Sequence, residues 1–335
     1  MDVENRTPSY SKPESRSGVP GSEYRDVEFT SDDAVLRGRL YLPHTLPAPI
    51  VVMAHGFSAT VPMVLDRFAE CFRDRGIAVF VFDHRGHGDS DGEPRGEINH
   101  WVQARGYLDA ISATRTFEGF DTAPIAVWGD SFSSRVALGV AALDDRVGAL
   151  VIQSPALGDR VASDTTDDAQ LDVIREFLDA GALRAPEATW TSAPVVSADQ
   201  TSSPSALTPL TAFRWFIEYG ARYGTGWTNR VTYTMPKGAP RFDPFVFAPR
   251  VRVPTQVIVA RHDEMPGASS DVTRAVADHL AGTTEVLEVD GGHFGLLEYP
   301  SALFTQVSTA EADFLTRVLR PASVTATLRS AVRQT

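Results

Sequence analysis

Short, continuous apolar runs recur along most of the chain, and amphipathic stretches separate them. The runs are rich in Val, Ile and Ala: PIVVMA, IAVFVF, PIAVW, VGALVI, TQVIVA and TEVLEV. Parallel strands that are covered on both faces have this character, because neither face meets water. Helical spacing between the runs predicts helices over residues 64–75, 100–117, 132–143, 269–281 and 302–319. The alternation predicts an α/β fold with a doubly wound, mostly parallel sheet.

Two other patterns flank this alternation. Apolar and polar residues alternate over 27–29 and 35–42, on either side of the turn-forming sequence Ser-Asp-Asp, which predicts a β-hairpin. Residues 1–22 are rich in Ser, Pro and Gly and show no periodicity, so we expect a disordered N-terminal tail. We expect a second tail over residues 321–335.

A long segment interrupts the strand pattern. Residues 155–250 contain no clear buried strand but include the helical sequence AQLDVIREFLDAGAL and the aromatic sequence TAFRWFIEYGARYGTGW. A structureless loop of this length is uncommon in a compact domain. We therefore expect a helical cap that is inserted into an α/β core formed by residues 23–154 and 251–320.

The sequence GDSFS carries the first candidate for chemistry. Ser131 follows the apolar run that ends at Trp128 and precedes a helical stretch, which is the setting of a nucleophile on a strand-to-helix turn. Such a turn crowds the backbone, and the small residues Gly129 and Ser133 stand where space is needed. Taken alone, the match also fits a serine that caps a helix.

Three further elements follow the ends of predicted strands. The loop His-Gly-Phe that ends at Phe57 can turn backbone N–H groups inward. His293 lies on a glycine loop, where an imidazole can reach the serine and accept its proton. Asp263 follows its strand by a short turn and can orient the imidazole, and the adjacent Glu264 is the alternative acid. The chain order Ser131, Asp263, His293 makes a chance match improbable.

With these residues the chain resembles serine hydrolases of the α/β-hydrolase fold, over residues 24–319 but without the details of the cap. The sequence FDHRGHGDSDGEPRGEI is similar to the strand and loop that many members place beside the oxyanion loop. Together with HDEMP it resembles the bacterial branch of dienelactone hydrolases and acetyl esterases. The chain departs from the family pattern at Ser133, where glycine is usual, and in the long cap.

The resemblance implies the roles of the site residues. Ser131 would be the nucleophile, His293 the general base and acid, and Asp263 the orienting acid, while the N–H groups of Phe57 and Phe132 would form an oxyanion hole. It implies cleavage of a carboxylic ester or thioester through an acyl-enzyme. The same triad also serves acyltransferases, cyclases and C–C bond hydrolases, and a non-catalytic binding protein on this fold is a further alternative.

The amino-acid composition argues against several classes of binding partner. The formal net charge is −12 and no cluster of Lys and Arg occurs, which argues against nucleic-acid or membrane partners. No signal-peptide or membrane-spanning run is apparent, so we expect a cytoplasmic protein. The single cysteine, Cys71, excludes an intrachain disulfide and Cys/His metal motifs, and we expect no cofactor and no metal.

Aromatic residues of the cap give the one indication about the substrate. Trp190, Trp215 and Trp227 lie in the inserted segment, and they predict an apolar or aromatic wall over a small-molecule pocket. Helical spacing of neighbouring aromatic residues also fits packing inside the cap. The sequence does not indicate the natural substrate or the oligomeric state.

Overall fold

The computed structural model describes residues 15–17, 23–120, 122–161, 168–181 and 183–319. Three residues of the expected N-terminal tail form a short strand, β1 (Ser15–Ser17), which pairs antiparallel with β2 (Glu23–Ser31). Without β1, the outer edge of β2 would leave backbone groups unpaired, and a passing segment can pair with them. The rest of that tail and the expected tail at 321–335 lie outside the described residues.

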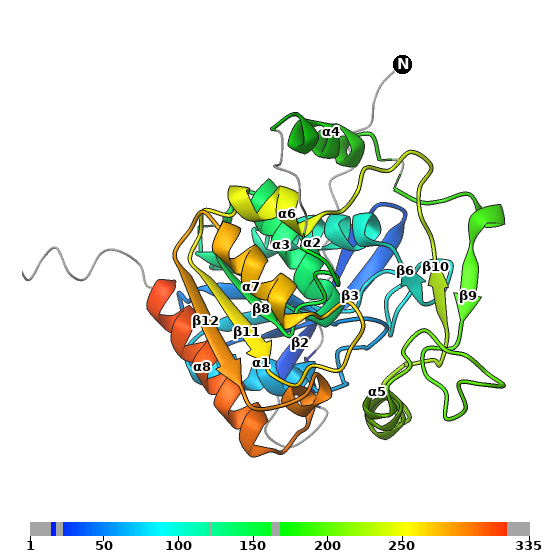
Figure 1. Cartoon of the computed structure of the whole chain (residues 1–335). Helices are drawn as coiled ribbons and strands as arrows, with labels where there is room; N and C mark the ends of the chain where they lie inside the picture. Colours follow the sequence, from blue (N-terminus) through cyan, green and yellow to red (C-terminus); the bar gives the residue numbers. More distant parts are fainter. Residues whose placement is uncertain (1–14, 18–22, 121, 162–167, 182, 320–335) are drawn as a thin grey trace, which may run out of the picture.

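A nine-stranded sheet forms the centre of the molecule (Figure 1). Its order is β1-β2-β3-β5-β4-β7-β8-β11-β12, and the strands from β5 to β12 are parallel. The first three strands run antiparallel, and β2 and β3 form the predicted hairpin. The six apolar runs are all strands of this sheet. The remaining strands are β3 (Ala34–Tyr41), β4 (Ile50–Ala54), β5 (Ala78–Phe82), β7 (Ile125–Asp130), β8 (Val147–Gln153), β11 (Thr255–Ala260) and β12 (Thr284–Val289).

Helices cover both faces of the sheet, which explains why its inner strands β4, β5, β7 and β11 are buried along their whole length. Along β4, Ile50 and Val52 belong to one hydrophobic cluster, whereas Val51 and Met53 belong to the other. Figure 1 shows α2, α3 and α7 on one side of the sheet and α1 and α8 on the other. The five predicted helices are present, with ends that differ by at most a few residues: α1 (Leu65–Asp74), α2 (His100–Thr114), α3 (Ser131–Leu143), α7 (Ser270–His279) and α8 (Ala302–Val318).

The segment at 155–250, called the insertion from here on, lies between β8 and β11. It contains helices, but also two strands that the sequence pattern did not predict, because three residues are too few for a periodicity. These strands join β6 (Glu97–Ile98) in a small sheet of order β6-β10-β9. The described elements of the insertion are α4 (Asp168–Asp179), η1 (Glu187–Thr189), β9 (Thr191–Ala193), α5 (Leu210–Trp215), the π-helical η2 (Phe216–Gly220), β10 (Val231–Tyr233), α6 (Pro244–Phe247) and η3 (Ala248–Arg250).

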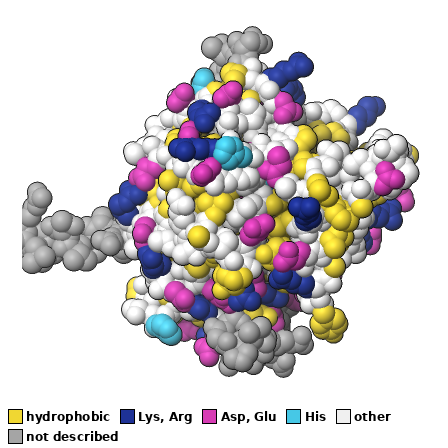
Figure 2. Space-filling view, turned by 60° about the horizontal axis from the view of Figure 1, so that its bottom comes forward, with side chains coloured by type: hydrophobic (Ala, Val, Ile, Leu, Met, Phe, Trp, Pro, Cys, Tyr) yellow, Lys and Arg dark blue, Asp and Glu magenta, His cyan; other side chains and the backbone are white. Residues whose placement is uncertain are grey.

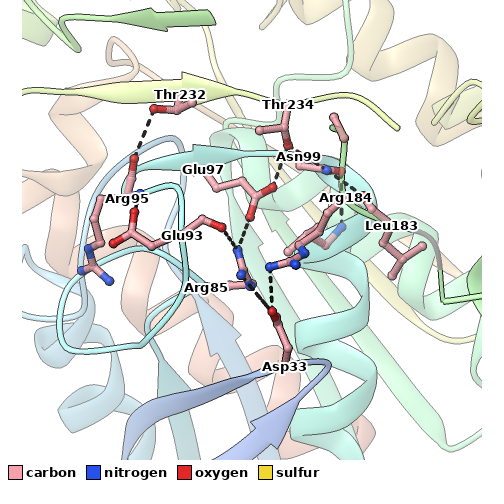
Figure 3. Close-up of polar contacts among 12 residues, drawn as sticks. Asp33, Arg85, Glu93, Arg95, Glu97, Asn99, Leu183, Arg184, Thr232 and Thr234 are labelled. Atoms are coloured by element: carbon pink, nitrogen blue, oxygen red, sulfur yellow. Dashed lines mark hydrogen bonds and ion pairs between the residues drawn. The ribbon is translucent and has the colours of Figure 1, made fainter. Parts of the chain in front are cut away.

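Buried polar contacts attach the insertion to the core (Figure 3). Arg85 Nη1 lies 2.7 Å from the Glu97 carboxylate, and these side chains are only 4% and 1% exposed. The hydroxyl of Thr234, in the insertion, donates to the same carboxylate. On the other side, Asp33 of the β2–β3 turn accepts from Arg85 and pairs with Arg184 of the insertion. The β-hairpin, the loop after β5 and the insertion therefore share one charged network.

The surface carries mixed charge. Figure 2 shows acidic and basic side chains interspersed over one face of the molecule. Among the described residues, no helix combines the length and apolar character needed to cross a membrane.

Candidate active site

The nucleophile candidate lies on a strained turn between β7 and α3. Ser131 has φ +51°, a left-handed conformation that is costly for a residue with a side chain. A Cβ at Gly129 would lie 2.5 Å from the carbonyl oxygen of Ser133, so only glycine fits there. Ser133, in place of the usual glycine, donates its hydroxyl to the carbonyl of Ala54 at 2.9 Å. This hydrogen bond connects the turn to the end of β4.

The histidine and aspartate candidates complete a row with Ser131. Nε2 of His293 lies 2.9 Å from Ser131 Oγ. Its Nδ1 lies 2.8 and 3.0 Å from the two carboxylate oxygens of Asp263. Both side chains are nearly buried, at 3% and 5% exposure. With its proton on Nδ1, the imidazole donates to the carboxylate and presents a free Nε2 to the hydroxyl.

The two adjacent acids have different partners. Asp263 faces the imidazole, whereas Oε2 of Glu264 accepts the backbone N–H of His293 at 2.9 Å. The other oxygen of Glu264 accepts from the hydroxyl of Thr211 in α5. A Cβ at Gly292 would lie 2.7 Å from Glu264 Oε2, so the second glycine of the loop leaves room for this carboxylate. Glu264 thus holds the backbone of the loop that carries His293.

A third carboxylate lies beside this row. Asp130 is buried, and burial raises its pKa to about 6, against the opposing effects of His293 and of the N–H of Gly56. A Cβ on Gly56 would lie 2.9 Å from Asp130 Oδ2. Because residue 56 has no side chain, the loop after β4 approaches the nucleophile turn closely.

The loop after β4 and the start of α3 carry the two candidate oxyanion donors. Phe132 is the second residue of α3, so its N–H has no acceptor within the helix. Phe57 follows Gly56, and the rings of the two phenylalanines are 5.8 Å apart. His55 fixes this loop: its Nδ1 donates to the carbonyl of Gly56 and its Nε2 accepts the N–H of His84. Burial lowers the pKa of His55 well below the usual value, which suits this structural role.

The three tryptophans predicted to line the substrate pocket make contacts within the protein. Trp215 is 4% exposed, and its indole N–H donates to the carbonyl of Leu297 at 3.1 Å. The Trp227 ring packs 5.6 Å from that of Phe216. Trp190 donates to a carbonyl of its own segment. These contacts support the packing interpretation, and a contact with substrate stays a prediction.

Sequence reasoning did not assign a role to Tyr107. Its hydroxyl accepts the N–H of Ala54 at 3.1 Å and donates to the carbonyl of Trp128 at 2.8 Å. It therefore connects the ends of β4 and β7 from α2. No sequence signal distinguishes this tyrosine from one that only packs in the core.

Comparison with known proteins identifies the family. The family model described as serine aminopeptidase S33, Hydrolase_4, matches residues 45–293, a range that includes Ser131, Asp263 and His293. The chain belongs to this family of α/β hydrolases. The resemblance and the fold class that the sequence predicted are thereby confirmed.

Curated relatives of this α/β hydrolase include the quorum-quenching protein AidA of Acinetobacter baumannii. It is 29% identical over 306 residues, which cover 88% of this chain and 95% of that protein. Thiohydrolase aneE of Aspergillus aculeatus is 39% identical over 154 residues, or 46% and 48% of the two chains. Polyketide transferase af380 of Aspergillus fumigatus is 38% identical over 131 residues, or 39% and 44%. The chain thus matches about half the length of the latter two relatives.

Solved structures share the fold. The structure of DcsB in complex with its substrate analogue has a TM-score of 0.68 at 22% identity, and the alignment covers 88% of this chain and 99% of that chain. The α/β hydrolase GrgF from Penicillium sp. has a TM-score of 0.65 at 23% identity with the same coverage.

Proposed function

We propose that this α/β hydrolase cleaves a carboxylic ester or thioester of a small molecule through an acyl-enzyme on Ser131. One observation carries the proposal: Ser131, His293 and Asp263 form a continuous row with separations of 2.8–3.0 Å. Side chains in this relation move a proton from a hydroxyl to an imidazole, and the resulting imidazolium is stabilised by the carboxylate.

The reaction has two halves. His293 accepts the proton of Ser131 while Oγ attacks the carbonyl carbon, and it then protonates the departing alcohol or thiol. The N–H groups of Phe57 and Phe132 receive the oxyanion, and the loss of such a donor typically costs about 2.7–4 kcal/mol of transition-state stabilisation. Water, deprotonated by His293, attacks the acyl-enzyme and releases the acid and free Ser131.

Acyl transfer is the second candidate. The relative named polyketide transferase favours it, because interception of the acyl-enzyme by an alcohol or amine uses the same residues. Measurement of the products formed when an alcohol competes with water distinguishes the two: an ester product indicates transfer, and acid alone indicates hydrolysis.

The proposal extends to the role of the insertion, the class of substrate and the location of the protein in the cell. We propose that the insertion acts as a cap and that the substrate is apolar or aromatic. The rings of Phe57, Phe132 and Tyr233 support this, because Phe57 lies 5.8 and 6.1 Å from the other two. We also propose a cytoplasmic site of action, which cell fractionation tests.

The first experiment is the intact mass of the protein after incubation with a fluorophosphonate. We expect one adduct on the parent and none on Ser131→Ala, because only an activated serine reacts. Ester hydrolysis should fall by roughly 10⁴-fold or more in Ser131→Ala. A folded parent without an adduct would contradict the proposal and favour a binding protein on this fold.

A further inference from the structure

Arg135 lies one helical turn after the nucleophile on α3. Helical side chains lean toward the N-terminus of their helix, so the side chain of Arg135 extends toward the end that carries Ser131. A Cβ on Gly158 would lie 3.4 Å from Arg135 Nη2. Gly158 in turn donates its N–H to the carbonyl of Gly267, in the loop that follows Asp263. The guanidinium therefore lies at the same edge of the sheet as the triad.

The guanidinium has no partner among the residues that the structure describes. Its Nε is buried without a hydrogen bond, and no salt bridge to Arg135 occurs in this part of the chain. Two acids are near but engaged: Asp159 accepts the N–H of Gly267 at 2.7 Å, and Asp243 caps α6 by accepting the N–H of Phe245 at 3.0 Å. Burial outweighs the attraction of these two carboxylates and lowers the pKa of Arg135, and Arg241 adds a second positive charge nearby. This position therefore favours an anion from outside the protein.

A second unpartnered polar group lies beside Arg135. The ring of His100 stacks between Phe132, at 4.2 Å, and Phe242, at 5.2 Å. Its Nε2 is buried without a hydrogen bond among the described residues. Burial, followed by the charge of Arg135, lowers the pKa of His100 to about 3, so the ring is neutral at pH 7 and available as a donor or acceptor.

These two groups adjoin the proposed reaction centre. Phe132, against which His100 stacks, follows Ser131 directly and carries one of the proposed oxyanion donors. Four helical residues rise about 6 Å along the helix axis, and the side chain of Arg135 leans back toward Ser131, so both groups can contact one small molecule. Beside Ser131 the chain thus brings together aromatic rings, one cation and one neutral imidazole.

We propose that Arg135, assisted by His100, binds a carboxylate that the substrate carries a few bonds from its scissile carbonyl. This inference rests on the proposed function, because Ser131 supplies the point from which the substrate extends. A guanidinium binds a carboxylate through two parallel hydrogen bonds, which gives direction as well as charge. The preferred substrates are then half-esters or half-thioesters of dicarboxylic acids, or esters whose alcohol part bears the carboxylate.

Matched esters test the proposal. The first pair is mono-4-nitrophenyl glutarate and 4-nitrophenyl pentanoate, which differ in the carboxylate of the acyl part. The second pair is the butanoate of 3-hydroxybenzoate and that of its methyl ester, which differ in the alcohol part. We expect the parent to prefer the charged member of one pair. Arg135→Gln should lower kcat/KM for that member roughly 10- to 100-fold and change its neutral counterpart less than about threefold.

Further variants guard against a structural explanation. Arg135→Lys keeps the charge but not the paired hydrogen bonds, so it should restore part of the preference. The matched control is Arg317→Gln. Arg317 on α8 is exposed and pairs with Glu285 on β12, so this substitution should leave the substrate preference unchanged. Equal losses for both members of a pair, or no preference in the parent, would overturn the proposal.

Binding of glutarate gives a readout that does not need turnover. Calorimetry should detect glutarate bound to the parent and not to Arg135→Gln. That result together with a parent that neither hydrolyses esters nor reacts with a fluorophosphonate would count against the proposed function and for the anion site. Ester hydrolysis without glutarate binding and without a preference for the charged ester would support the proposed function and overturn the anion site.

Discussion

The carboxyl edge of the core and the insertion are built on different principles. In the core, each residue of the row follows a strand of the parallel sheet, and the register of β7, β8, β11 and β12 brings the loops together. In the insertion, short elements bury apolar side chains such as Trp215 and Phe247 in the hydrophobic clusters and add polar contacts, such as those of Thr234 and Arg184 with the core. The candidate catalytic residues are thus positioned by backbone hydrogen bonds of a large sheet, whereas the insertion is positioned by side-chain packing and polar contacts.

The largest effect should come from the core edge. Asp263→Asn keeps the size of the side chain but removes the charge that orients His293, so kcat should fall about 10⁴-fold. The measurement is the steady-state rate with an activated ester.

Glu264→Gln is the matched control for that change. Its amide oxygen can still accept the N–H of His293, so we expect a loss of less than about tenfold. If Glu264→Gln lost more activity than Asp263→Asn, the role of triad acid would pass to Glu264.

The next-largest effect should come from the charged network that attaches the insertion to the core. Arg85→Ala leaves Glu97 charged, buried and unpaired, and we expect a loss of about 3–5 kcal/mol in the free energy of unfolding. Urea denaturation measures it. The control is Arg317→Ala, an exposed ion pair that should cost about 0–1 kcal/mol. Similar losses for the two variants would show that the network contributes little to attachment.

A pH-dependent effect sharpens the description of the core edge. Because burial raises the pKa of Asp130 to about 6, the folded protein binds its proton more tightly than the unfolded chain does. Its contribution is therefore present below the unfolded pKa near 4 and is lost as the pH rises through about 6. Relative to Asp130→Asn, the parent should lose on the order of 2 kcal/mol between pH 4 and pH 7 in urea titrations. A constant difference across this range would contradict a raised pKa.

The smallest effect concerns the departure from the family pattern. Ser133→Ala removes the hydrogen bond to the carbonyl of Ala54 and should cost about 1 kcal/mol of stability. Activity should change little, because the turn needs a small residue rather than a hydroxyl. Thermal unfolding measures the first and ester hydrolysis the second. A large loss of activity without loss of stability would assign the hydroxyl a role in the reaction.

The core was largely predictable from the sequence, whereas the insertion was not. Strands β4, β5, β7, β8 and β11 were predictable because both of their faces are buried, and this leaves uninterrupted apolar runs. The edge strand β12 is only partly buried, and its apolar residues alternate with Glu285 and Glu288. Ser131 and His293 were recognisable from glycine-rich turns after those strands. The choice between Asp263 and Glu264 depended on which way one loop directs two neighbouring carboxylates, and spacing does not encode that.

Other features left no pattern in the sequence. Strands β9 and β10 are three residues long and gain their order from β6, which lies far away along the chain. Arg135 has ordinary helical spacing, and its distinction is the absence of a partner among the described residues. Such properties arise from tertiary contacts, so they become visible only when the chain is folded.

Glu264 has a consequence for how this protein can be re-engineered. One oxygen of its carboxylate holds the backbone of His293, and the other accepts from Thr211 of the insertion. The insertion is therefore not an exchangeable module: a graft from a relative that lacks a hydroxyl at this place would release one anchor of the loop that carries the base. Recombination between relatives should succeed more often when the Thr211 segment travels together with the loop at 263–264.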